Sequence, residues 1–166
     1  MSWSFNFIIH IVLFGLTTSV VVASFILHRQ IIKEKSWEKK HLLSGLIRIF
    51  SRFVPFNAVL LLVTGFGNMM NRYGTNAQWP SEEWLSIKVV LFVILAANGL
   101  YLAPHLGLKR NMLIKSVIEG SGPADADQQI VKQNFSITAL FIVQMILLLS
   151  ILFLSVYGSG KHPGMF

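Results

Sequence analysis

Cysteine is absent from the 166 residues, and charged residues are scarce, at 13%. The first absence excludes disulfide bonds and thiolate metal ligands. The second sets the chain apart from soluble domains, in which about 25% of residues are charged. The sequence also lacks a glycine-rich phosphate loop, a nucleophile elbow, an HExxH zinc motif, an internal repeat and a low-complexity linker. What remains is 54% hydrophobic, with a mean hydropathy of +0.63, and predicts one domain, 1–166, of the polytopic membrane class.

Four long apolar segments predict four transmembrane helices, at about residues 5–28, 46–71, 84–105 and 134–157. Each segment is long enough, at 1.5 Å per residue, to cross roughly 30 Å of hydrocarbon. None of them alternates in the way a strand does. The first segment differs from a signal peptide because no basic residue precedes it and its apolar run is too long. The predicted fold is therefore an all-α, four-helix membrane bundle.

The net charge of +7 has a distribution typical of membrane topology. Eleven of the 14 Lys and Arg residues fall near or after the ends of the first and third helices: Arg29, Lys33, Lys35, Lys39, Lys40, Arg48, Arg52, Lys109, Arg110, Lys115 and Lys132. The positive-inside rule predicts that these segments are cytoplasmic and that both termini lie on the outer, periplasmic side of a bacterial inner membrane. Anionic lipid is then the expected partner of the basic segments, and no nucleic acid is expected.

The third predicted helix, WLSIKVVLFVILAANGLYLAPH, gathers its polar residues on one stripe. Trp84, Lys88, Asn98 and His105 follow a four-and-three spacing that places them along one broad face. Ionisable residues within membrane spans are rare, and they usually face the bundle interior and mark a function. The alternative is structural: Lys88 lies one turn from Trp84 and could snorkel to the interface.

The first predicted helix carries two histidines in phase. His10 and His28 are eighteen residues apart, or five helical turns, so they face the same way about 27 Å apart. The first and third helices run in the same direction through the membrane. His10 and Lys88 are therefore expected at one depth near the outer face, and His28 and His105 at another near the inner face.

Histidines within a small membrane bundle suggest haem b. Haem needs an axial nitrogen ligand, an apolar slot for the ring and cationic or polar groups for its propionates, and bundle cores are common sites for it. His10, His28 and His105 are the candidate iron ligands, with a neutral Lys88 as a further one, and Asn98 is a candidate polar contact. One haem would bind near His10 and Lys88. A second, near His28 and His105, would favour electron transfer.

Taken in order, these motifs resemble the HemJ-type protoporphyrinogen oxidases and the related copper-resistance-D-like membrane proteins, over roughly residues 5–150. The motifs are His10, a basic residue near the end of the first helix, LLLVTGFGNMM in the second, WLSIK opening the third, and an asparagine just before the fourth. The resemblance implies a bound b-type haem and functional roles for His10, Arg29, Trp84 and Lys88. His10 would be the axial ligand or proton acceptor, Lys88 a second ligand or carboxylate partner, and Trp84 an aromatic wall. Electrons would pass to quinone or another carrier.

Two other interpretations stay open at this point. The polar residues could be hydrogen-bonding contacts between helices, in a homodimer or in a structural or assembly subunit of a larger membrane complex. Asn57, Thr64 and Asn68 suit that role, and Gly65 and Gly67 allow helices to approach closely. Copper handling through Met69 and Met70 ranks third, because thioethers are soft ligands but no further ligands cluster near them.

Overall fold

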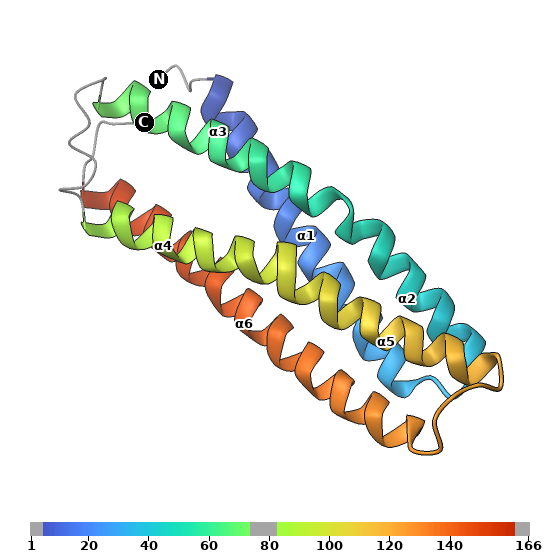
Figure 1. Ribbon diagram of the computed structural model, residues 1–166. Coiled ribbons are helices and arrows are strands. Elements are labelled where there is room, and N and C mark those ends of the chain that lie inside the picture. The colour runs from blue at the N-terminus through green and yellow to red at the C-terminus, as the bar shows by residue number, and fades with distance from the viewer. Residues whose placement is uncertain (1–4, 74–82, 162–166) are drawn as a thin grey trace.

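The computed structural model describes residues 5–73 and 83–161, and within those ranges every regular element is helical (Figure 1). The elements are α1 (Phe5–Lys33), α2 (Trp37–Ser51), α3 (Phe53–Tyr73), α4 (Glu83–Ala97), the π-helical segment η2 (Asn98–Leu102), α5 (Ala103–Ile118) and α6 (Ala126–Lys161). They form four continuous stretches that are long and apolar enough to cross a membrane: Phe5–Lys33, Trp37–Asn71, Glu83–Ile118 and Ala126–Gly158. The prediction of an all-helical protein with four helices long and apolar enough to span a membrane is confirmed.

The helices extend well beyond the apolar segments that predicted them. Much of the basic stretch expected as a loop after the first helix is helical, because α1 continues to Lys33 and α2 begins at Trp37. Ser36 caps α2: its hydroxyl oxygen accepts a hydrogen bond from the backbone N–H of Lys39 at 3.3 Å. Hydropathy marks only the part of a helix that lies in lipid, whereas the helical hydrogen bonds continue into water. The predicted boundaries were therefore too short.

The second span is interrupted near its basic end. Arg52 separates α2 from α3, and its backbone N–H bonds to Ile49 O at 3.2 Å rather than continuing the α-helical pattern. Pro55 follows three residues later and lacks the N–H that would bond to the carbonyl of Ser51. Arg48 and Arg52 are exposed here.

The four spans pack as a bundle in which each span contacts the spans before and after it in the chain, and the last span closes the ring against the first. α1 contacts α2, α3 and α6, while α6 contacts α4 and α5, and α2 meets α5 (Figure 1). We call the end with the turns at residues 34–36 and 119–125 the basic end, and the end where α1 begins and α6 finishes the opposite end. The terminal residues 1–4 and 162–166 lie outside the described ranges, but the helices that lead to them share one end of the bundle.

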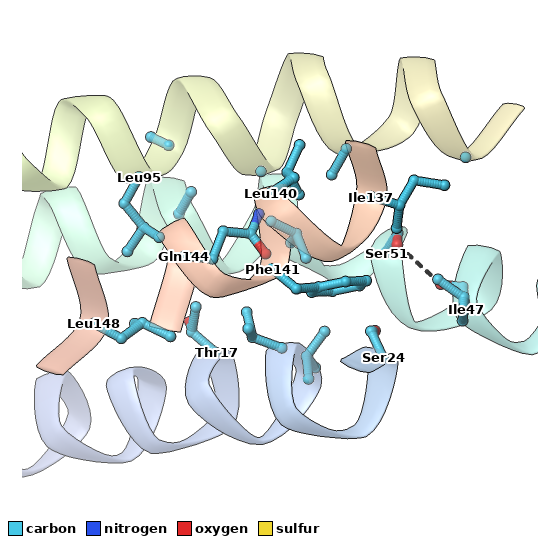
Figure 2. Close-up of a pocket in the computed structure, with 18 of the residues that line it drawn as sticks. Thr17, Ser24, Ile47, Ser51, Leu95, Ile137, Leu140, Phe141, Gln144 and Leu148 are labelled. Atoms are coloured by element: carbon cyan, nitrogen blue, oxygen red, sulfur yellow. Dashed lines mark hydrogen bonds between the residues drawn. The ribbon is translucent and has the colours of Figure 1, made fainter. Parts of the chain in front are cut away.

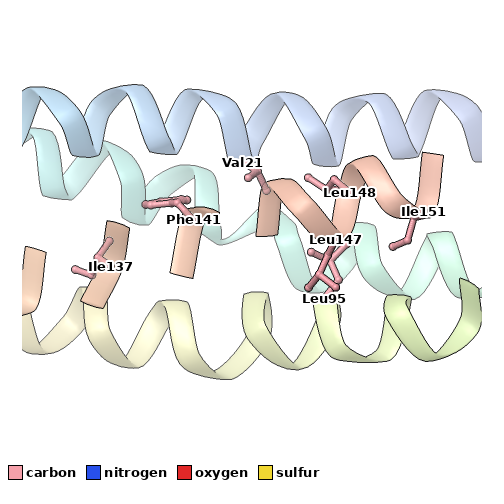
Figure 3. Packing of buried hydrophobic residues seen from close by; sticks show 7 residues of the cluster. All are labelled: Val21, Leu95, Ile137, Phe141, Leu147, Leu148 and Ile151. Carbon is pink, nitrogen blue, oxygen red and sulfur yellow. The ribbon is translucent and has the colours of Figure 1, made fainter. Parts of the chain in front are cut away.

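The hydrophobic core lies where α6 meets α1 and α4 (Figure 3). Its buried members are Val21, Leu95, Ile137, Phe141, Leu147, Leu148 and Ile151. Five of these seven come from α6, so the last span contributes most of the core. The other spans expose most of their apolar side chains, as expected for surfaces that face lipid.

A glycine lets an aromatic ring pack against the end of α6. Trp84, in the first turn of α4, lies over Gly158 so closely that a Cβ there would overlap ring atoms Cε3, Cδ2 and Cε2. We therefore expect Gly158→Ala to lower the free energy of unfolding by about 1–3 kcal/mol, as overpacking does. Thermal or denaturant unfolding in detergent micelles measures this loss.

The matched control is Gly15→Ala on α1, because a Cβ at Gly15 meets nothing within 4 Å. Replacing glycine by alanine within a helix is itself favourable, by roughly 0.5–1 kcal/mol. The control is therefore expected to be neutral or stabilising. Equal effects of the two substitutions would show that the Trp84 contact contributes nothing specific.

Candidate functional site

Polar side chains join α1 to α3 near the opposite end of the bundle. Asn6 Nδ2 donates to Asn68 Oδ1 at 2.6 Å and to the carbonyl of Thr64 at 2.8 Å. One turn further along, His10 Nδ1 lies 2.8 Å from Thr64 Oγ1. Deeper still, Asn57 Nδ2 donates to Thr17 Oγ1 at 3.0 Å. This ladder bears out the sequence-based view that polar residues of the second span contact other helices.

The hydrogen bonds around His10 define its tautomer. The Thr64 hydroxyl has one hydrogen, which it donates to the carbonyl of Leu60, four residues earlier in its own helix, at 2.7 Å. Its oxygen is then the acceptor for His10, so Nδ1 carries the ring proton and Nε2 holds a lone pair. Gly65 gives the ring room, because a Cβ there would lie 3.2 Å from His10 Cε1. His10 is thus oriented through Nδ1, and the hydrogen-bond pattern assigns the lone pair to Nε2.

Lys88 and Trp84 lie on α4 at the same end as His10. Lys88 is half-buried and within electrostatic range of His10. Trp84 is also half-buried, and its ring faces Gly158 of α6. The structure therefore places Lys88 at the same end of the bundle as His10 and Trp84 at the contact between α4 and α6.

A second polar cluster lies inside the basic end and links three spans. Arg110 of α5 is 2% exposed and His28 of α1 is fully buried. Arg110 Nη1 lies 2.7 Å from His28 Nδ1 and 3.4 Å from Asn134 Oδ1. His28 Nε2 lies 2.9 Å from Thr138 Oγ1, and that hydroxyl donates to the carbonyl of Asn134 at 2.8 Å. The donor and acceptor in each of these hydrogen bonds can be assigned by starting from Arg110.

An arginine side chain only donates hydrogen bonds. His28 Nδ1 must therefore accept from Arg110, so Nε2 carries the ring proton and donates to Thr138. Both nitrogens of His28 are engaged, and the ring also packs against Phe141, with centroids 5.5 Å apart. In this arrangement His28 has no lone pair left for a metal ion.

The other candidate residues do not join either cluster. His105 is exposed on α5 and stacks on Tyr101, itself 72% exposed, with ring centroids 6.4 Å apart. Arg29 is exposed on α1. Asn98 is buried at the start of η2. The predicted second level of ligands is therefore not brought together, since His28 points into the bundle and His105 points out.

The π-helical segment explains why His105 faces outward. In η2 the backbone N–H of Ala103 bonds to the carbonyl of Asn98, five residues back, and such a turn inserts one extra residue into a helix. Pro104 favours the change, because it has no N–H and its ring crowds the carbonyl of Leu100. The predicted stripe through positions 98, 102 and 105 is shifted by one residue, so that 103, 106 and 110 face inward instead.

The observed exposures agree with this shift of register. Leu102 is 47% exposed, and His105 and Lys109 are also exposed. Leu106 is half-buried, and Arg110 is almost completely buried. The positive-inside pattern predicted Arg110 as one of the cytoplasmic basic residues. It did not predict that this side chain is buried and bonded to His28. Pro104 was the available signal that the helical face changes at this point.

A cavity of about 90 Å³ lies inside the bundle. Figure 2 shows side chains of α1, α2, α4 and α6 converging on it, among them Thr17, Ser51, Leu95 and Gln144. The wall is mostly apolar, and Arg110 is its lining residue on α5 nearest the basic end. Binding sites for drug-sized ligands are larger, about 300–1,000 Å³. His10 does not line this cavity, so the two candidate sites are separate.

Comparisons with known proteins leave the site to be judged on its own geometry. No family model, no curated protein and no solved structure matches the chain. Among the described residues, no group of three or more His, Cys, Asp or Glu side chains is arranged to hold a metal ion.

Proposed function

We propose that the protein binds one haem b near the opposite end of the bundle, with His10 as an axial ligand, and acts as a redox protein of the bacterial inner membrane. The observation that carries the proposal is the hydrogen bond between His10 and Thr64. Histidines that ligate metals usually donate the proton of their other ring nitrogen to a fixed acceptor, which sets the tautomer and the orientation of the ring. His10 has this arrangement within a predominantly apolar span.

A neighbouring cation would serve the haem propionates. Lys88 is a cation within electrostatic range of His10, suited to a propionate or, when neutral, to the second axial position. When bound, haem would supply one-electron chemistry. His10 and Thr64 would hold the ligand nitrogen in place, and Lys88 would orient an acidic substrate or the propionates. Porphyrinogen oxidation and electron exchange with a quinone both remain within this proposal.

The arrangement of His28 and His105 favours one haem over two. Both nitrogens of His28 are hydrogen-bonded, and His105 stacks on Tyr101 on the exposed face. The basic end would face the cytoplasm, where anionic lipid attracts its lysines and arginines. Association as a homodimer or within a larger complex is compatible with the extensive apolar surface.

The test is the reduced-minus-oxidised absorbance spectrum of protein expressed with ample haem and purified in mild detergent. Wild type is expected to show a b-type α band at about one haem per chain. His10→Ala should lose most of the haem, and Thr64→Val should weaken its binding by about 10–100-fold, the usual cost of losing a ligand's hydrogen-bond partner. His105→Ala is the matched control and should retain full occupancy.

A folded but colourless wild-type protein would contradict the proposal. The ladder between α1 and α3 would then serve helix packing alone, as in a structural or assembly subunit. A haem band that survives His10→Ala but disappears in His28→Ala would place the haem ligand at the basic end and would also contradict the proposal. Bound copper that depends on Met69 and Met70 would instead support copper handling.

A further inference from the structure

Arg110 is a buried cation without a carboxylate partner in the described part of the chain. The one ion pair between described residues joins Lys115 to Glu119 on the surface, at 3.5 Å. Arg110 hydrogen-bonds to His28 and Asn134 through Nη1, while its Nε is buried and has no partner. A guanidinium has five N–H donors, and a buried charge is costly unless it is paired. The neutral contacts leave the charge of Arg110 uncompensated.

Arg110 also lines the cavity, whose remaining wall is mostly apolar. On α6 the lining residues run from Ile137 to Leu148, eleven positions or about 16 Å along the helix. On α5 the wall is made of Ala103, Leu106 and Gly107, as far as Arg110. A Cβ at Gly107 would meet nothing within 4 Å, so the space beside the arginine is open. The cavity is thus cationic near the basic end and apolar towards the membrane centre.

We infer that this cavity binds a single-chain amphiphile with an anionic head group, a carboxylate or a phosphate monoester, whose charge pairs with Arg110. The head would lie near the basic end, where the head groups of one leaflet lie, and the chain would extend towards the middle of the membrane. A volume of about 90 Å³ holds roughly six water-sized groups, enough for the head and the first carbons. The remainder of a longer chain would lie outside the cavity. This inference does not depend on haem binding.

The experiment measures binding of radiolabelled decanoate to the full-length protein purified in a non-ionic detergent and freed of lipid. Decyl phosphate and uncharged decanol are tested as competitors. Decanoate should bind and raise the melting temperature, and decanol should compete at least about tenfold more weakly, because a hydrogen bond to a charged group contributes that much or more. Whichever of decanoate and decyl phosphate binds more tightly identifies the preferred head group.

Two variants locate the site. Gly107→Leu fills the open space beside Arg110 and should reduce decanoate affinity at least about tenfold without lowering the melting temperature of the free protein. Gly15→Leu is its matched control, at an exposed glycine that also has open space but does not line the cavity; it should bind like wild type. Arg110→Gln should remove the preference for decanoate over decanol.

Three results would overturn the inference: no saturable binding of decanoate or decyl phosphate, equal competition by decanol, or unchanged binding in Gly107→Leu. The last result remains informative even if Arg110→Gln fails to fold. The haem spectrum provides an independent readout, since Gly107→Leu should leave the α band that depends on His10 unchanged. Failure of one proposal is therefore distinguishable from failure of the other.

Discussion

His28→Phe is expected to destabilise the protein by about 2–3 kcal/mol, the largest effect of any single substitution considered. His28 Nδ1 accepts a hydrogen bond of 2.7 Å from Arg110, which is 2% exposed and has no carboxylate partner among the described residues. A hydrogen bond to a charged group contributes about 1.5–3 kcal/mol, and a buried donor left unsatisfied adds to the loss. Phenylalanine retains the ring that packs on Phe141 but accepts nothing from the arginine. Unfolding in detergent, followed by circular dichroism, measures the change.

A double-mutant cycle separates the loss of the hydrogen bond from the loss of ring packing. Arg110→Met removes the charge while keeping a long apolar side chain. In the double variant the loss should be smaller than the sum of the two single losses, by at least about 1 kcal/mol, because neither partner is then left unsatisfied. His105→Phe is the control on the exposed face and should change stability by no more than about 0.5 kcal/mol. Additive effects of His28→Phe and Arg110→Met would falsify the coupling.

The second large effect concerns the extra residue in η2. In a Pro104→Ala background, deleting Leu100 converts the π turn to an α turn and keeps Arg110 facing inward, so the variant is expected to fold. Inserting one alanine after Leu100 in the same background rotates everything that follows by about 100°, or one residue of a 3.6-residue turn. Arg110 would then face lipid, at a cost of about 2.5–3.5 kcal/mol, and would lose its contact with His28. The insertion is expected to abolish stable folding.

The deletion and the insertion are informative together because both are made at Leu100, and one shortens the helix by a residue while the other lengthens it by a residue. Yield of monodisperse protein and the melting temperature give the first comparison. Since the native chain has no cysteine, the single substitutions His105→Cys and Leu106→Cys can report which side is exposed. In the native register the thiol at position 105 should react with a maleimide faster than the thiol at position 106. If the deletion proves as damaging as the insertion, η2 does not simply accommodate an extra residue.

The large share of the core that the fourth span contributes also depended on the structure. The four predicted segments have similar lengths, and although the span Ala126–Gly158 has the highest mean hydropathy of the four, 2.7, hydropathy does not say which helices are neighbours. Packing places five of the seven core residues on α6, between α1 on one side and α4 and α5 on the other. Which helices become neighbours depends on side-chain fit between distant segments, and a single sequence does not reveal it.

The sequence by itself determined the membrane class, the number of spans and the approximate depth of the polar residues within them. Apolar length and a rise of 1.5 Å per residue are sufficient for all three. On this basis His10 and Lys88 were expected at one depth, and the structure places them within electrostatic range of each other. The hydrogen bond from His10 to Thr64 could not be predicted from the sequence, because the rotation of each helix about its own axis depends on its neighbours.

Only the tertiary structure decided which residues face the interior beyond Asn98. A regular helix would continue the stripe to His105, whereas the π turn before Pro104 moves the inward face to Ala103, Leu106 and Arg110. Periodicity assumes a constant number of residues per turn. One extra residue in a turn is therefore enough to place His105, a predicted ligand, on the surface and Arg110 in the core. The cationic end of the cavity exists because of this local change in helical geometry.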